Sequence, residues 1–239
     1  MAASRRSRAP EVLDDPATDP YLAARSLRDV AVANRLFGGS SAVLAEVMAT
    51  FPRLGARATL LDVGTGMGDI PALARAAAAR AGIALETIGL EASFGLALGS
   101  RPSTTSAVVG DGRSLPFADQ SVDIVTCSQV LHHFFDGDAR QLVRELHRVA
   151  RLRVIISELR RSRLAAAGIW LASFALGFHP VSRHDGVVSV MRGFTTGELS
   201  ETVRDATGAT AAVRRRLAFR VTASWTPPVG RTLTDTPAA

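Results

Sequence analysis

The chain has 239 residues, of which 47% are hydrophobic and 21% are charged, and its formal net charge is +6. This composition is typical of a folded protein with one sizeable domain and argues against a disordered or fibrous chain. All 28 basic residues are arginine, so a Walker phosphate loop and a pyridoxal-binding site, which both need lysine, are excluded.

The exclusive use of arginine, together with much alanine, indicates a GC-rich and therefore bacterial genome. The single cysteine, Cys127, excludes a disulfide framework and a cysteine-rich zinc site, so we expect a reducing, cytoplasmic location and no metal. The first 20 residues lack the apolar core of a signal peptide. No RNA-binding signature accompanies the arginine clusters, so we expect no nucleic acid partner; the clusters are 5–8, 160–163 and 214–216.

The amino-terminal region divides into a tail and two predicted helices. Residues 1–19 are rich in Arg, Ala, Pro and Asp, which predicts a disordered tail. An approximate apolar stripe over residues 21–37 predicts a helix that ends at two glycines. A second helix begins at Ser40 or Ser41 and runs to about Thr50, so we expect a helical cap over 20–52.

The stretch Leu60–Pro71, LLDVGTGMGDIP, predicts a strand, a tight turn and the first residues of a helix over 70–81. Gly64, Gly66 and Gly68 permit backbone angles that other residues resist, and they let the backbone approach a ligand closely. The free N–H groups and the dipole of the following helix favour an anionic group at its first turn.

The middle of the chain alternates strands and helices. The predicted elements are strand 60–63, helix 70–81, strand 85–90, a short helix at 93–99, strands 106–110 and 122–127, helix 138–150 and strand 152–157. Such alternation favours a parallel sheet with helices on both faces. Polar residues that end these strands then converge on one rim of the sheet, namely Asp62, Glu91, Asp111, Ser128 and Glu158.

The ordered motifs DVGTGMGD, GLEAS, GDGRSLPF and VDIVTCSQVLHHF resemble those of class I S-adenosylmethionine-dependent methyltransferases. The similarity is greatest to the small-molecule group of ubiquinone and menaquinone biosynthesis, methyltransferase type 11, and it covers residues 60–159. It implies an α/β, Rossmann-like fold with a seven-stranded, mostly parallel sheet, helices on both faces, an N-terminal helical cap and a lid insertion after strand 5. A single domain over 20–226, with a flexible tail at 227–239, is expected.

The resemblance also implies S-adenosyl-L-methionine as the cofactor and assigns residues to it. Its methionine part would lie on the loop of Gly64, Thr65, Gly66 and Gly68, with Asp62 near the ammonium group. Glu91 would accept hydrogen bonds from the ribose hydroxyls, and Asp111, beside Gly112, from the adenine amino group. Ser128 and Gln129 would border the sulfonium.

Catalytic candidates follow from proton chemistry. His132 and His133 come directly after the fourth strand, and histidine titrates near neutral pH. We favour His133 as a base over His132, although either could simply bond the backbone. Glu158, at the end of the fifth strand, would face the acceptor. His184 and Asp185 could orient the acceptor from the insertion, whereas the Asp-Gly pair there equally fits a plain turn.

The insertion at 160–192 contains an apolar helix over 164–177. Trp170 and Phe174 belong to an excess of apolar residues, which predicts a lid that closes on a small, apolar, phenolic or quinone-like acceptor of C- or O-methylation. Its flanking arginines could contact a membrane surface, and a buried helix or a dimer contact are the alternatives.

The remaining sequence completes the sheet. Thr195 and Glu198 are spaced as a capping box that begins a helix to about Ala206. Alternating residues from Leu217 to Trp225 predict two strands over 211–225, and hence seven in all.

Two other functions fit part of these patterns. An NAD-dependent oxidoreductase also uses a glycine turn and an acid after the second strand. The Tyr-x-x-x-Lys pair of short-chain dehydrogenases is impossible here, because the chain has no lysine. A non-catalytic S-adenosylmethionine-binding protein is the other alternative, since methyl transfer can proceed without a unique side chain.

Overall fold

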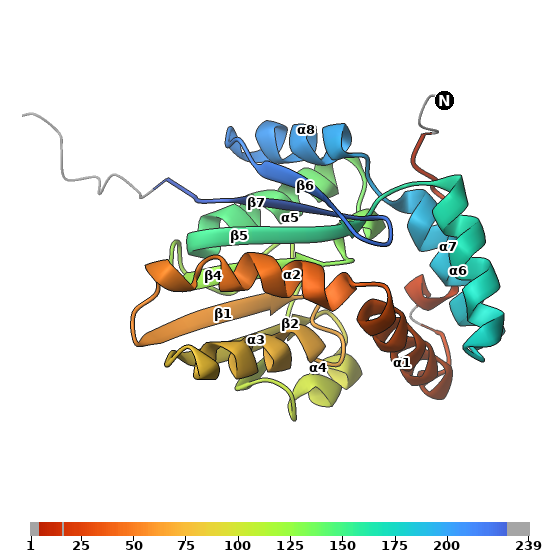
Figure 1. Cartoon of the computed structure of the whole chain (residues 1–239), viewed down its shortest axis with the longest axis horizontal. Coiled ribbons are helices and arrows are strands. Elements are labelled where there is room, and N and C mark those ends of the chain that lie inside the picture. Colours follow the sequence, from red (N-terminus) through yellow and green to blue (C-terminus); the bar gives the residue numbers. More distant parts are fainter. Residues whose placement is uncertain (1–4, 16, 229–239) are drawn as a thin grey trace, which may run out of the picture.

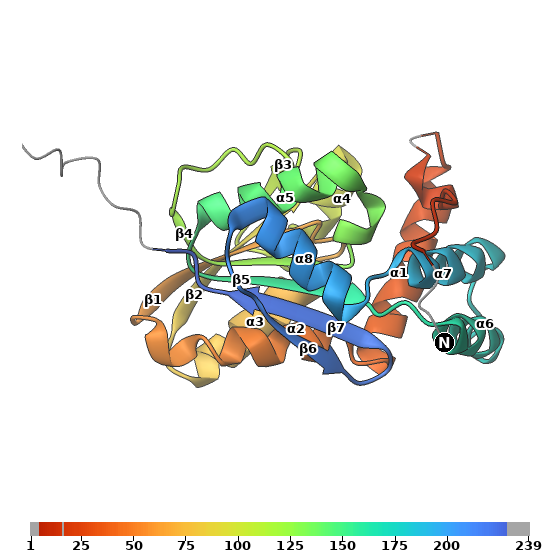
Figure 2. The same cartoon turned by 90° about the horizontal axis from the view of Figure 1, so that it is seen from above.

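A computed structural model describes residues 5–15 and 17–228 of the chain. Its centre is a seven-stranded sheet in the order β3-β2-β1-β4-β5-β7-β6. Helices lie on both faces of this sheet, and three further helices gather beyond one end of it (Figures 1 and 2). Within the described residues, no helix has the combination of length and apolar character that a membrane crossing requires.

The first five strands are parallel, and the last two form an antiparallel hairpin whose β7 pairs with β5. This confirms the predicted seven-stranded, mostly parallel sheet. The strands are β1 Arg57–Val63, β2 Ala84–Glu91, β3 Ser106–Val109, β4 Val122–Ser128, β5 Ala150–Leu159, β6 Ala212–Arg216 and β7 Arg220–Trp225.

Successive residues of the central strands belong to two different cores. Leu60 packs in the core on the side of α2 (Gly39–Met48) and α3 (Asp69–Arg80). Leu61 packs in the core on the side of α5 (Asp136–Val149) and α8 (Thr196–Thr207). A strand buried on both faces needs apolar residues at every position, which explains the continuous apolar runs of the sequence. The short helix α4, Phe94–Ser100, packs near β2 and β3.

Three helices lie beyond the sheet and are called the cap from here on, namely α1 (Pro20–Leu36), α6 (Arg163–Ala175) and α7 (Pro180–Arg192). The second helix of the cap predicted over 20–52, α2, packs on the sheet instead. The sequence predicted α1 and α6 but not α7, because its Asp185-Gly186 pair was interpreted as a possible turn. In the structure both residues lie inside α7. A Cβ on Gly186 would lie 3.5 Å from Cγ1 of Ile169, an ordinary van der Waals contact, so this face of α7 packs against α6.

The expectation of a disordered tail over residues 1–19 is wrong for residues 5–15, whereas 1–4 lie outside the described residues. The backbone N–H groups of Val12 and Leu13 donate to the Asp185 carboxylate over 2.9 and 3.1 Å. Arg192 donates to the Ala9 carbonyl over 2.9 Å, and Glu11 is buried. The composition of the segment could not reveal these partners, because all of them come from the cap. Most of the predicted tail at 227–239 lies outside the described residues.

The carboxyl-terminal hairpin differs in one detail from its predicted pattern. Leu217, Ala218 and Phe219 form the turn between β6 and β7, and Ala218 and Phe219 have positive φ angles of 49° and 57°. Leu217 is 89% exposed, so the alternating apolar stripe does not continue through it. All six residues of β7 are buried, because this strand lies between β5 and β6 and under helices.

Candidate active site

The glycine turn after β1 has the backbone that its sequence predicts. Gly64, Gly66 and Gly68 have φ angles of 71°, 56° and 75°, and Gly68 is the N-cap of α3. A Cβ on Gly64 would lie 2.2 Å from Cγ2 of Val130, whereas one on Gly66 would meet nothing within 4 Å. Packing therefore requires glycine at the first position, and the backbone at Gly66 stays open to a ligand. These features fit a loop that holds the methionine part of S-adenosylmethionine.

Two buried acids flank this turn. Asp62 accepts a hydrogen bond from the Thr126 hydroxyl over 2.6 Å, and burial raises the pKa of its carboxyl to about 7. Glu91, at the end of β2, accepts a hydrogen bond from the Gly66 N–H group, and burial raises its pKa as well. A buried carboxylate without a cation beside it is costly, so both acids are suited to partners that a ligand supplies.

The loop after β3 is more exposed. The Asp111 carboxylate pairs with Arg113 over 2.8 Å, and this guanidinium also holds Asp138 over 2.9 Å. Hydrogen bonds from Arg113 lower the pKa of Asp111. A Cβ on Gly112 would lie 2.9 Å from Cδ1 of Leu142, so the glycine here lets the loop pack against α5.

The remaining predicted cofactor residues lie around the end of β4. Thr65 is buried, Ser128 is the last residue of β4, and Gln129 has a positive φ of 57°. The Gln129 side-chain amide donates to Oδ1 of Asn34, which comes from α1. The cap is thus joined directly to the rim of the sheet at the predicted position of the sulfonium.

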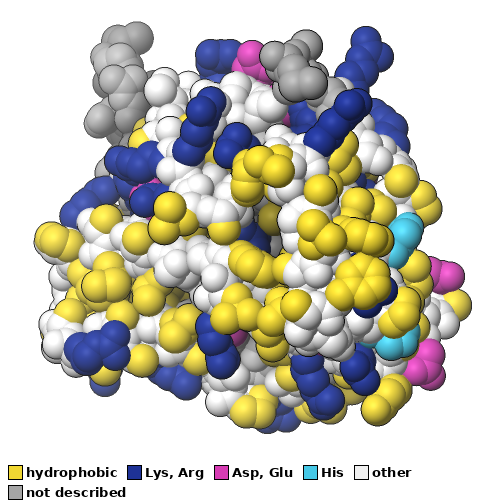
Figure 3. Space-filling view, turned by 45° about the vertical axis from the view of Figure 1, so that its right-hand side comes forward, with side chains coloured by type: hydrophobic (Ala, Val, Ile, Leu, Met, Phe, Trp, Pro, Cys, Tyr) yellow, Lys and Arg dark blue, Asp and Glu magenta, His cyan; other side chains and the backbone are white. Residues whose placement is uncertain are grey.

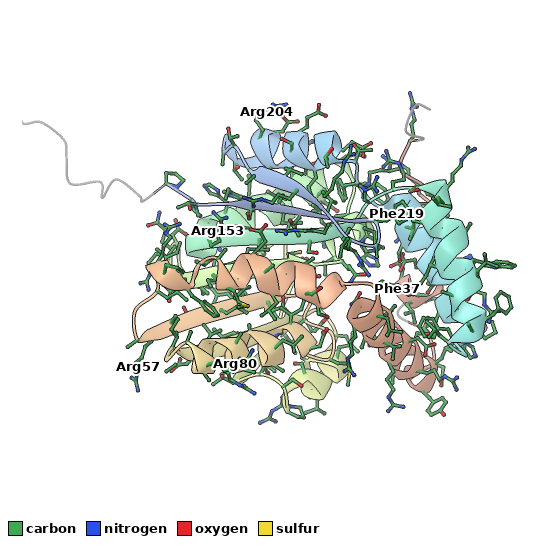
Figure 4. All side chains as sticks on the ribbon, in the orientation of Figure 1. Phe37, Arg57, Arg80, Arg153, Arg204 and Phe219 are labelled. Carbon is green, nitrogen blue, oxygen red and sulfur yellow. The ribbon has the colours of Figure 1, made fainter. Side chains whose placement is uncertain are left out.

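A cavity of about 540 Å³ lies between this rim and the cap. Phe37, beyond the end of α1, and Phe219, from the β6–β7 turn, both line it and are labelled in Figure 4. Most of the lining side chains are apolar, among them Leu27, Val30, Leu96, Leu164, Ile169 and Phe178. A cavity of this size and character suits a small organic molecule.

His132 and Glu158 form a buried pair at the wall of the cavity. The Nδ1 atom of His132 lies 2.8 Å from Oε2 of Glu158, and the side chains are 2% and 0% exposed. The second ring nitrogen, Nε2, is buried and has no hydrogen-bond partner in the described part of the chain. Burial alone would lower the pKa of His132, but the carboxylates of Glu158 and Glu11 raise it to about 9.

Glu11 of the amino-terminal segment approaches this pair, with its Oε1 atom 3.7 Å from Nε2 of His132. Among the described residues, Glu11, His132 and His133 offer possible metal ligands within 4.8 Å of one another. The Arg192 guanidinium, however, lies 3.4 Å from both Oε1 of Glu11 and Nδ1 of His133. A positive charge at this point competes with a metal cation, so the cluster carries no metal proposal.

The structure separates the predicted catalytic residues. Glu158 contacts His132 and not His133, which is one-third exposed and pairs with Asp14 over 2.8 Å. His184 is 56% exposed, binds Asp185 and is not among the residues that line the cavity. His132 and His133 both line the cavity, so the choice between them as the base stays a prediction.

The sequence analysis missed several polar residues that line the cavity, among them Glu11, Asn34 and Arg220. The mostly apolar lining also includes Asp29, Asp185 and three serines. A polar residue within an apolar helix stripe was a usable signal for Asn34, but neither Glu11 nor Arg220 belongs to a motif.

Comparisons with known proteins agree with this geometry. Residues 61–156 match a family model described as a methyltransferase domain. A demethylmenaquinone methyltransferase from Thermotoga maritima is 34% identical over 104 residues, which cover 42% of this chain and 43% of that protein. The matched region therefore spans less than half the length of this relative.

Solved structures show the same fold. A SAM-dependent methyltransferase from Aquifex aeolicus superposes with a TM-score of 0.57 and 15% identity, over 85% of this chain and 98% of that one. The CurJ carbon methyltransferase superposes with a TM-score of 0.62 and 12% identity, over 87% and 61%.

The fold is the one found in these solved methyltransferases, and the glycine turn and the two acids lie at the carboxyl ends of its parallel strands. Residues 61–156 thus resemble the methyltransferase domain family, and part of the chain resembles one demethylmenaquinone methyltransferase. The name of the Aquifex aeolicus structure gives S-adenosylmethionine as the cofactor of that protein.

Proposed function

We propose that the protein transfers a methyl group from S-adenosylmethionine to a small organic acceptor in the 540 Å³ cavity. The observation that carries this proposal is the buried His132–Glu158 pair at the cavity wall, because Nε2 of His132 makes no hydrogen bond within the described residues and has only the Glu11 carboxylate 3.7 Å away. Such a pair can act as a general base when the acceptor must lose a proton as it is methylated.

The cofactor supplies an electrophilic methyl group on a sulfonium, and the chain's own residues do the rest. His132 Nε2 takes the proton of an acidic C–H or phenolic O–H group. Glu158 accepts a hydrogen bond from Nδ1, which fixes the tautomer of the ring and stabilises the imidazolium that forms. The cap helices exclude bulk water and hold the acceptor in line with the methyl group.

The apolar lining supports an acceptor with an apolar body and one acidic group, such as a phenol or a quinone precursor. Both C- and O-methylation fit this chemistry. A nucleic acid does not suit an apolar cavity of this kind, and we propose a small molecule instead.

A peripheral membrane contact is supported by the outer surface of α6. Trp170, Leu171 and Phe174 are 48%, 63% and 52% exposed, and Figure 3 shows hydrophobic side chains on this side of the molecule. An apolar surface next to arginines can bind an anionic membrane surface. The protein could then take up an apolar acceptor from the membrane.

The test is incubation of the protein with methyl-labelled S-adenosylmethionine and an extract of the native cells, followed by mass spectrometry of the labelled products. A labelled small molecule that disappears with a His132→Asn variant is the expected result. Cofactor binding with no labelled product in any extract would favour the non-catalytic alternative. Tight NAD binding without S-adenosylmethionine binding would favour an oxidoreductase.

A further inference from the structure

Arg220, the first residue of β7, places a buried guanidinium at the cavity. The residue is 4% exposed and lines the cavity. Its Nη2 atom donates to Oδ1 of Asn34 over 3.1 Å. The Nε and Nη1 atoms are buried and have no hydrogen-bond partner within residues 5–15 and 17–228. Arg220 also forms no ion pair with any of these residues, since the nearby Glu158 is engaged by His132.

Other buried arginines of this chain are neutralised by carboxylates. Arg161 pairs with Glu198 over 2.6 Å, and Arg192 pairs with Asp14 over 2.8 Å. Removing a charged group from water is costly unless it is paired. Burial lowers the pKa of Arg220 to about 10, while Glu158 acts in the opposite direction. The side chain therefore stays charged at neutral pH without a partner, which points to a ligand that supplies the partner.

The surroundings of the guanidinium also favour an anion. A Cβ on Gly39 would lie 3.3 Å from Cζ of Arg220, so the guanidinium lies against the first residue of α2. The first N–H groups of a helix lack partners within the helix, and its dipole attracts negative charge there. The Arg220 guanidinium thus lies beside the positive end of α2.

We infer that Arg220 binds a carboxylate group of a ligand in this cavity. A carboxylate matches the planar guanidinium and accepts charge-assisted hydrogen bonds from its free N–H groups. Two ligands of the site can supply it. One is the amino-acid end of the cofactor, and the other is an acceptor that carries a carboxylic acid. The inference rests on the proposed function, because it describes how ligands of that same site are held.

The experiment measures binding alone, so it does not depend on turnover. Arg220→Gln removes the charge, and Arg220→Lys keeps it with one ammonium group. Arg215→Gln is the matched control, because Arg215 is an exposed arginine of the same hairpin with no ion pair among the described residues. Thermal unfolding of each unliganded variant shows whether it folds.

The first arm compares S-adenosylhomocysteine with its decarboxylated analogue, which keeps the ammonium group, by calorimetry. If the cofactor supplies the carboxylate, Arg220→Gln weakens S-adenosylhomocysteine binding by about 10- to 100-fold and leaves binding of the analogue unchanged. The second arm uses protein saturated with S-adenosylhomocysteine, with naphthalene-2-carboxylate and its carboxamide as probes. If the acceptor supplies the carboxylate, only binding of the carboxylate probe is lost.

In either case Arg220→Lys binds the carboxylate ligand more tightly than Arg220→Gln does, and Arg215→Gln binds it as the wild type does. Without ligand, Arg220→Gln unfolds at or above the wild-type temperature. The inference is overturned if Arg220→Gln changes neither arm, or if it weakens the ligands with and without a carboxylate equally. Should Arg220→Gln fail to fold, Arg220→Lys decides by the same comparison, since a weakened preference for the carboxylate is expected. Intact Arg220-dependent binding without methyl transfer would refute only the proposed function.

Discussion

Nδ1 of His132 lies 2.8 Å from Oε2 of Glu158, and both side chains are buried. The two residues are 26 positions apart in the sequence and meet because β4 and β5 are adjacent parallel strands that end on the same side of the sheet. The pair orients the free Nε2 atom of the ring at the cavity wall.

We expect His132→Asn and Glu158→Gln to lower kcat of methyl transfer by about 10²- to 10⁴-fold, the usual contribution of a positioned base. Affinity for S-adenosylhomocysteine should change little in both variants. His184→Asn provides the comparison, because that side chain is exposed and does not line the cavity. If His184→Asn is impaired as much as His132→Asn, the assignment of the base is wrong.

The rate should rise with pH. A base must be neutral, and Glu158 and Glu11 raise the pKa of His132 to about 9 against the effect of burial. The imidazole is therefore mostly protonated at pH 7, and kcat is expected to increase between pH 6 and 9. Glu158→Gln removes one of the negative charges, so the midpoint should move to lower pH. A rate that falls over this range would contradict the role of His132.

Cofactor binding should release a proton near pH 6. Burial raises the pKa of Asp62 to about 7, so its carboxyl is mostly protonated at pH 6, whereas an ammonium group prefers the ionised form. Affinity for S-adenosylhomocysteine is expected to rise from pH 6 to 8. Calorimetry in two buffers of different ionisation enthalpy measures the proton directly. If an Asp62→Asn variant releases the same proton on binding, the proton comes from another group.

The assignment of Asp111 to the adenine can be tested by comparison with Asp138, because both acids pair with the same arginine. Asp111 and Asp138 both pair with Arg113, but only Asp111 is assigned to the adenine. Asp111→Ala and Glu91→Ala should each weaken cofactor binding by roughly 1–3 kcal/mol, because ligand donors lose their acceptor. Asp138→Ala breaks the same arginine pairing and should bind normally. Equal loss in Asp111→Ala and Asp138→Ala would mean that only the loop conformation matters.

Substitutions on the cavity side and on the outer side of α6 should affect different properties of the protein. Ile169 lines the cavity, whereas Trp170 and Phe174 are about half exposed and do not. Ile169→Ala is expected to raise KM for the acceptor several-fold. Joint replacement of Trp170 and Phe174 by alanine should leave KM for a water-soluble acceptor unchanged and reduce co-sedimentation with anionic liposomes. Unchanged sedimentation would remove the support for membrane contact.

The sequence by itself determined the fold class and the cofactor rim. Buried parallel strands appear as short apolar runs, and the turn after β1 needs glycine because its φ angles are positive. Asp62, Glu91 and Asp111 could be placed because the carboxyl ends of parallel strands share one edge. These features depend on local patterns and on the order of those patterns, and both can be read from the sequence.

Tertiary structure alone decided the chemistry of the acceptor side. Glu11 reaches His132 from 121 residues away, held by backbone donors and by Arg192, and no local pattern records such a contact. Glu158 binds His132, whereas the adjacent His133 pairs with Asp14, although the two ring centroids lie only 4.3 Å apart in one short 3₁₀ turn, Leu131–His133. The buried charge of Arg220 was equally invisible, since only the three-dimensional packing shows that it has no partner in the described chain. Pairing and burial are properties of residues distant in sequence, and only the folded chain brings those residues together.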